Sequence, residues 1–236
     1  YSPTLKSVEK LYPTFTATGT FSLENTTGLT TLQDTNSTAN TTYTNISDTS
    51  IALGLSGNTG ATTFQFTDAA VAGTETVSLA LSSAAGTVTI AGVETINVSS
   101  TGGSSTLGGL TATSTTTLNV TGSQDLSLGT LSTKIATIAA SAFTGDLTAN
   151  GTNTSGNTIT GGTGDDTLTG EDGADDVLTG GAGNDTLTPG TGDNTLSGGA
   201  GDDTFAMAAD LTSADTITGG DGSDTVTISA AVSVAN

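Results

Sequence analysis

A nine-residue pattern in the last third of the chain carries the residues that could do chemistry. From Gly161 the sequence reads GGTGDDTLT, GEDGADDVLT, GGAGNDTLT, PGTGDNTLS and GGAGDDTFA, and GGDGSDTVT follows at 219–227. Four of these copies fit G-G-x-G-x-D-x-U-x, in which U is a large apolar residue. Several copies in register at a nine-residue period predict a repeat architecture.

The residue types in this pattern favour an oxygen-ligated metal site. The glycines permit a tight backbone path with positive φ, which turns carbonyl oxygens towards a common point, and the aspartate at position six adds a carboxylate. If two repeats make one coil, each loop stacks on the loop two repeats later, about 4.8 Å away. Stacked carboxylates repel at that distance, and a hard divalent cation between them removes the repulsion. Such a site suits Ca²⁺, and because the chain has no His and no Cys, imidazole and thiolate sites are excluded.

Short strands must position these loops. The x-U-x part of each repeat predicts a three-residue strand in which only U points inward. Upstream, residues 14–150 contain short apolar runs separated by turn residues, roughly nine to thirteen residues apart, which also indicates strands. Thr and Gly are poor helix formers, so the fold class is all-β, and one continuous parallel β-solenoid is the simplest architecture. Its inward residues should form two columns on opposite sheets: Leu168, Leu187 and Phe205 on one, and Leu178, Leu196 and Ile217 on the other.

Composition divides the chain into three regions. Residues 1–13 hold two of the three Lys and are interpreted as an N-terminal junction or linker, in which Ser2 and Pro3 could start a short helix. Residues 14–150 form a Thr/Ser-rich β-solenoid region, and residues 151–236 form the calcium-binding roll. The whole chain has 23 Asp+Glu against 3 Lys+Arg, for a net charge of -20. Nucleic acid is therefore excluded as a partner, and no apolar window is long enough to predict membrane insertion.

The repeats resemble the RTX family, the hemolysin-type calcium-binding nonapeptide repeat proteins. That resemblance implies a right-handed parallel β-roll, several Ca²⁺ ions between successive loops, and type I secretion to the outside of a Gram-negative bacterium. Its position-six ligands map to Asp166, Asp185, Asp203 and Asp224. Three calcium sites should lie between these four loops. The loop carbonyl ligands on the same edge are assigned to Gly162, Gly164, Gly181, Gly183, Gly199, Gly201, Gly220 and Gly222.

The other edge departs from the pattern. The repeat GEDGADDVLT has one extra loop residue and leaves Asp176 as its ligand, with Asp175 and Asp172 nearby. PGTGDNTLS places Asn194 in the ligand position, and residues 207–218 keep only a DTIT tail with Asp215. We therefore expect an asymmetric roll, with full calcium occupancy on one edge and weak or absent calcium on the other. The competing interpretation is that all these loops are Gly/Asp turns without metal.

The upstream region is similar in style to secreted S-layer proteins of the RTX type, which implies a structural extracellular protein. Calcium-dependent folding would then drive self-association into a lattice or filament, and the N-terminal residues Lys6 and Lys10 could contact a cell-surface glycan. An RTX adhesin, a spacer module and the accessory calcium-binding tail of a larger secreted enzyme remain alternatives. Catalysis within this chain is not expected, because the chain lacks the His and Cys that Ser-His, Cys and zinc chemistry require. Ice binding through Thr-x-Thr rows also competes, although regular rows are not evident in the loops.

Overall fold

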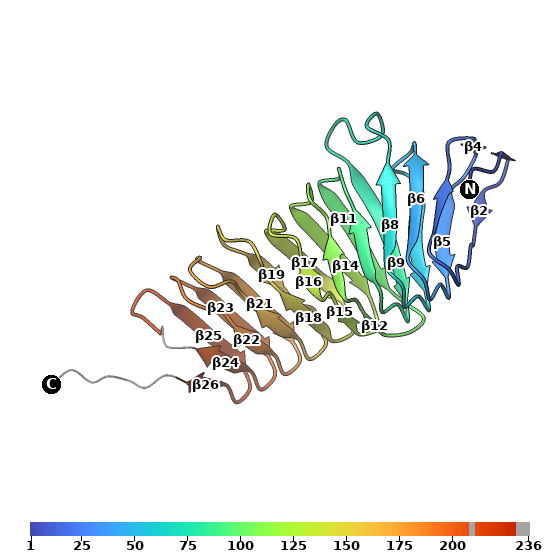
Figure 1. The fold of residues 1–236 in the computed structure, drawn as a ribbon. Helices are drawn as coiled ribbons and strands as arrows, with labels where there is room; N and C mark the ends of the chain where they lie inside the picture. Colours follow the sequence, from blue (N-terminus) through green and yellow to red (C-terminus); the bar gives the residue numbers. More distant parts are fainter. Residues whose placement is uncertain (208–210, 230–236) are drawn as a thin grey trace.

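The computed structural model describes residues 1–207 and 211–229, which form one elongated solenoid of parallel strands (Figure 1). The N-terminus lies at one end of the solenoid and the repeats lie at the other. Within these residues no helix is present, so the helix predicted at Ser2 is wrong. It follows as well that the described chain holds no helix able to span a bilayer. The predicted all-β parallel solenoid is confirmed.

One long sheet runs the length of the molecule and receives one strand from each coil. Its strand order is β2-β5-β7-β9-β11-β14-β17-β19-β21-β23-β25. The bounds of these strands are β2 (Lys10–Leu11), β5 (Thr31–Thr35), β7 (Ala52–Ser56), β9 (Thr76–Ser82), β11 (Thr95–Ser100), β14 (Thr117–Gly122), β17 (Thr137–Phe143), β19 (Thr158–Thr160), β21 (Val177–Ala182), β23 (Thr195–Ala200) and β25 (Thr216–Asp221).

Two further sheets share the other side of the solenoid. The N-terminal sheet contains β3 (Gly19–Ser22), β6 (Thr41–Ile46), β8 (Thr62–Phe66), β10 (Thr87–Ile90), β13 (Gly109–Thr111) and β16 (Thr130–Leu131). The C-terminal sheet contains β12 (Ser105–Thr106), β15 (Leu126–Ser127), β18 (Leu147–Asn150), β20 (Thr167–Thr169), β22 (Thr186–Thr188), β24 (Thr204–Met207) and β26 (Thr225–Ile228). Strands of both sheets alternate along residues 105–131. In these coils the C-terminal sheet begins and the N-terminal sheet ends.

The register of the repeat coils matches the two predicted apolar columns. On the C-terminal sheet Leu168 lies opposite Leu187, which lies opposite Phe205. On the long sheet the corresponding column consists of Leu178, Leu196 and Ile217. Thr186 lies opposite Thr204, 18 residues later, so two nonapeptides do make one coil.

The interior becomes thinner towards the repeats. Upstream strands bury several side chains each, as β9 does with Val77, Leu79 and Leu81, and the rings of Tyr43 and Phe64 stack inside the first coils with centroids 5.5 Å apart. Each repeat strand from β19 to β23 buries one large apolar side chain instead. Apolar burial per coil therefore falls where the acidic loops begin.

The N-terminal segment joins the solenoid as strands. Strand β1 (Leu5–Lys6) pairs with β4 (Thr26–Thr27), and β2 pairs with β5. Leu5 and Leu11 pack against the hydrophobic core, and this tertiary contact overrides the local helix-start signal. The boundaries predicted at residues 13 and 150 stay predictions, since the long sheet passes through both without a break.

Candidate metal centre

Four aspartates form a column on the edge that leads into the C-terminal sheet. We call Asp166, Asp185, Asp203 and Asp224 the first edge row. The backbone N–H of Asp166 donates to Asp185 Oδ1 at 2.8 Å, and that of Asp185 donates to Asp203 Oδ1 at 2.8 Å. In the same way, the backbone N–H of Asp203 donates to Asp224 Oδ1 at 3.1 Å. The structure thus brings these four predicted residues together at one-coil spacing, as their shared repeat position requires.

The second carboxylate oxygen in this row has partners at one place and lacks them at two. Asp166 Oδ2 accepts the N–H of Gly162 at 2.7 Å. In contrast, Asp185 Oδ2 and Asp203 Oδ2 accept no hydrogen bond within the described part of the chain. Both oxygens are buried, and each residue is only 1% exposed. A buried carboxylate oxygen without a partner is costly. A bound cation at these two oxygens would remove that cost.

Burial and mutual repulsion also perturb the ionisation of the row. Burial, reinforced by the neighbouring carboxylates of Asp166 and Asp203, raises the pKa of Asp185 to about 7. The pKa values of Asp166 and Asp203 are raised as well, again chiefly by burial. Without a cation these three carboxylates resist full ionisation, as expected for buried, stacked acids that lack a counter-charge.

The glycines of the repeat make room for this column. A Cβ atom at Gly180 would lie 2.1 Å from Asp185 Oδ2, so the first glycine of the repeat leaves space for the carboxylate. A Cβ atom at Gly181 would lie 2.1 Å from the Gly162 carbonyl oxygen, and one at Gly183 would lie 2.3 Å from that of Gly164. The same close approach to a carbonyl oxygen one coil earlier recurs at the other predicted positions, Gly162, Gly164, Gly199, Gly201, Gly220 and Gly222.

The opposite edge, which leads into the long sheet, holds a second edge row of Asn157, Asp176, Asn194 and Asp215. Its backbone N–H groups donate to the next side-chain oxygen in the same way, for example from Asp176 to Asn194 Oδ1 at 2.9 Å. Here, however, the remaining oxygens have protein donors. Asp176 Oδ2 accepts the N–H of Glu171 at 2.9 Å, and Asp215 Oδ2 accepts that of Thr212 at 2.7 Å. The two edges thus differ in whether these carboxylate oxygens have protein donors, while the predicted difference in calcium occupancy and the ligand assignments on both edges stay predictions.

Within residues 1–207 and 211–229, no three acidic side chains converge on one point. A cation on the first edge would therefore be held by carboxylates from two successive coils together with backbone carbonyl oxygens. That ligand set is the one Ca²⁺ accepts, since it takes six to eight oxygens with flexible geometry.

A further row of side chains was missed by the sequence analysis. Asp165, Asn184 and Asp202 lie directly before the first edge row and are exposed. Asp125 and Asp146 continue this column upstream, outside every nonapeptide, through the hydrogen bonds described below. A signal was present in the sequence, since an acidic residue precedes an apolar strand residue at both upstream places, in QDL and GDL.

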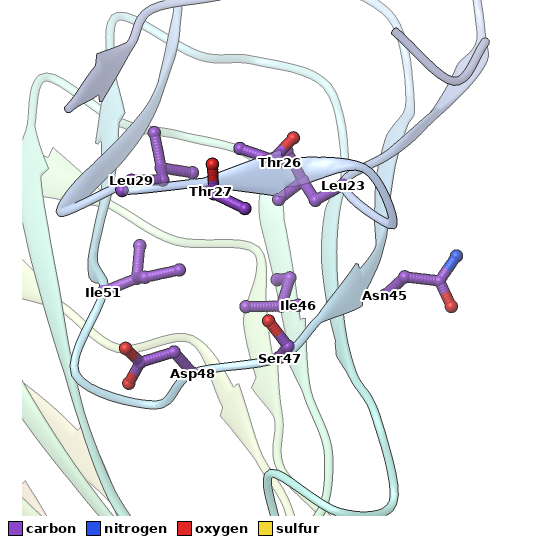
Figure 2. Close-up of a pocket in the computed structure, with 10 residues that line it drawn as sticks. Leu23, Thr26, Thr27, Leu29, Asn45, Ile46, Ser47, Asp48 and Ile51 are labelled. Atoms are coloured by element: carbon purple, nitrogen blue, oxygen red, sulfur yellow. The ribbon is translucent and has the colours of Figure 1, made fainter. Parts of the chain in front are cut away.

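One cavity lies far from this centre, in the first coils. It measures about 270 Å³ and opens between Thr26–Thr27 and the loop around Asp48. Figure 2 shows Leu23, Leu29, Ile46 and Ile51 around it, and these side chains belong to the hydrophobic core. The cavity contains none of the predicted ligands.

Comparison with known families agrees with this geometry. A scan against protein-family models matches the RTX calcium-binding nonapeptide repeat in four copies, over residues 152–187, 172–205 and 210–227. A search of the curated proteins found no match. The matched segments contain both edge rows. The C-terminal coils of this chain are therefore RTX calcium-binding nonapeptide repeats.

Proposed function

We propose that this chain is a non-catalytic structural module whose C-terminal coils fold when they bind calcium. The observation that carries the proposal is the pair of buried, unpartnered oxygens, Asp185 Oδ2 and Asp203 Oδ2, inside a column of stacked carboxylates. Calcium would provide the missing positive charge and use the loop carbonyls as further ligands. The predicted sites are the three gaps between the four loops of the first edge row.

Linkage between the ion and the fold supplies the mechanism. Residues 151–236 contain 14 acidic residues and no basic ones, so the metal-free loops repel one another. Each bound ion stabilises the fold by RT ln(1 + [Ca]/Kd) if the unfolded chain binds weakly. Extracellular modules bind calcium with Kd values of about 10⁻⁴ to 10⁻³ M, so folding would follow export from a low-calcium cytoplasm.

The biological role we propose is assembly at the cell surface. RTX repeats are typical of proteins exported by type I secretion, and the Thr-rich coils upstream are similar in style to those of S-layer proteins. Copies of the chain would associate into a lattice or filament outside a Gram-negative cell, and Lys6 and Lys10 in the first coil are candidate contacts for a surface glycan. A monomeric adhesin or spacer, or the accessory tail of a secreted enzyme, is the alternative role.

A calcium titration of the purified chain tests both parts. Far-UV circular dichroism follows folding and electron microscopy follows assembly, from excess chelator to millimolar calcium. Ordered arrays that appear together with β signal would support the lattice or filament. Folding without arrays would keep the calcium module and favour the adhesin or spacer, whereas an unchanged spectrum would contradict calcium-dependent folding.

A further inference from the structure

A continuous row of hydrogen bonds lies beside the first edge row, on its exposed side. Asp165 Oδ1 accepts the N–H of Asn184 at 2.7 Å, and Asn184 Oδ1 accepts that of Asp202 at 2.8 Å. Asp202 Oδ1 accepts the N–H of Ser223 at 2.8 Å. We call these residues, together with Asp146 and Asp125, the outer row.

The outer row binds successive coils in the direction opposite to the first edge row. In the first edge row, Asp185 Oδ1 accepts the N–H of the coil before it. In the outer row, Asp165 Oδ1 accepts the N–H of the coil after it. Each boundary between two repeat coils is therefore closed by one bond of each direction at neighbouring residues. The two together fix both the position and the orientation of each loop.

This row begins before the repeats do. The N–H of Asp165 donates to Asp146 Oδ1 at 2.9 Å, and the N–H of Asp146 donates to Asp125 Oδ1 at 3.2 Å. At these upstream coils the first edge column holds Leu126 and Leu147, which are buried, in place of aspartate. The Leu147 N–H already donates to Asp166 Oδ1 at 2.8 Å. The outer row thus crosses from coils that have an apolar column to coils that have an acidic one.

Charge is not needed for membership of the outer row. Asn184 is neutral, yet it accepts from Asp202 and donates to Asp165 at the same distances as its charged neighbours. The outer side chains are also exposed, whereas Asp166, Asp185 and Asp203 of the first edge row are buried. A hydrogen-bond acceptor at this position is what the geometry uses, so these residues differ in role from metal ligands.

We infer that the outer row consists of positioning residues, which transfer the register of the upstream coils to the first calcium loop. The coils around Leu126 and Leu147 need no cation in their column, so they can fold first and present Asp146 and the Leu147 N–H to residues 165 and 166. Calcium then adds the repeat coils to this preformed end. The inference rests on the proposed calcium-dependent folding and names Asp146 as the residue that connects the two regions.

Asp146 allows a direct test in the full chain. Asp146→Ala removes the acceptor of the Asp165 N–H, whereas Asp146→Asn keeps it. Asp68→Ala is the control, because Asp68 is also an exposed carboxylate but belongs neither to the edge rows nor to the outer row. The calcium midpoint of folding is measured by circular dichroism, and hydrogen exchange with mass spectrometry locates the protected segments.

Asp146→Ala should raise the calcium midpoint about two- to fivefold, the size expected for one lost hydrogen bond. Asp146→Asn and Asp68→Ala should stay near wild type. Equal shifts for Asp146→Ala and Asp146→Asn would make the charge responsible and overturn the inference, as would an unshifted Asp146→Ala. In chelator, residues 126–150 should stay protected while 161–227 exchange. Fast exchange in both segments would contradict the preformed end, whereas protection of the repeats without calcium would contradict the proposed function itself.

Discussion

Strand β9 in the upstream coils buries Val77, Leu79 and Leu81, whereas β20 in the repeat coils buries Leu168 alone. Each buried aliphatic side chain contributes about 1.5–3 kcal/mol, so a repeat strand forgoes several kcal/mol of apolar stabilisation. At the same place in the coil, the edge column changes from Leu147 to Asp166. Both regions are coils of the same solenoid, but they differ in what stabilises them. The upstream coils depend on apolar burial, whereas the repeat coils depend on the cation that we propose their acidic column binds.

Removing calcium should produce the largest difference in stability between the upstream coils and the repeat coils. In excess chelator we expect the repeat coils at 161–227 to lose their β structure, because their loops repel and their core is thin. The upstream coils should persist. Limited digestion with a non-specific serine protease, read by mass spectrometry, should leave a resistant fragment ending near residue 150. Uniform resistance or uniform digestion would remove the distinction between the regions.

Leu147→Asp should move the boundary between the apolar edge column and the acidic edge column upstream by one coil. The substitution places a carboxylate in a fully buried position and should cost about 3 kcal/mol or more without calcium. Because the new carboxylate extends the first edge row, calcium should recover part of the loss. Leu147→Ala is the matched variant, since it creates a cavity that calcium does not fill. Thermal melts with and without calcium compare the two, and equal calcium responses would count against the column as the determinant.

Within the repeats, Asp185→Ala should be more damaging than Asp175→Ala. Asp185 is 1% exposed and serves the gaps on both sides of its loop, and its loss leaves the Asp166 N–H without an acceptor. We expect a cost of about 2–4 kcal/mol and a calcium midpoint at least about tenfold higher. Asp175 is exposed on the second edge, where its Oδ1 accepts the Asp193 N–H. Equal calcium titrations for both variants would refute the edge assignment.

A smaller effect is expected from pH. The pKa of Asp185 in the metal-free fold is about 7, above its ordinary value, so the folded state holds a proton that the unfolded chain has lost. Stability of the metal-free roll should therefore increase as pH falls from about 7 towards 4, and decrease as pH rises through 7. Protons and calcium compete for the same carboxylate oxygens. The calcium concentration at the folding midpoint should therefore rise as pH falls over the same range. Circular dichroism in chelator and in calcium, at pH 5.5 and 8, measures both trends, and Asp185→Asn should weaken them.

The repeats could be predicted from the sequence because their period fixes the coil. Once GGxGxD recurs every nine residues, the columns through Leu187 and Leu196 and the row through Asp185 follow from alternation and strand spacing alone. The upstream part of the outer row could not be found this way. Asp125 and Asp146 lie outside the motif, and their alignment with Asp165 depends on coil lengths that only the structure fixes.

The upstream coils resisted prediction for a related reason. Their lengths vary, since Leu53 pairs with Leu79, 26 residues later, while Thr76 pairs with Thr95 after 19. The first segment was wrongly assigned a helix start because Ser2 and Pro3 satisfy a local rule. The contacts of Leu5 and Leu11 with the core decide its conformation, and no local pattern encodes them.

The parallel register has a consequence for how such a chain changes in evolution. Thr167 lies opposite Thr186, 19 residues later. A deletion of residues 167–185 would join Asp166 to Thr186 and leave each following strand beside an equivalent neighbour. Because contacts in a solenoid are made only between adjacent coils, gain or loss of genetic material in whole-coil lengths preserves both edges, while any other length breaks them. Descendants of this chain should therefore differ in reach and in the number of ions they hold by discrete steps.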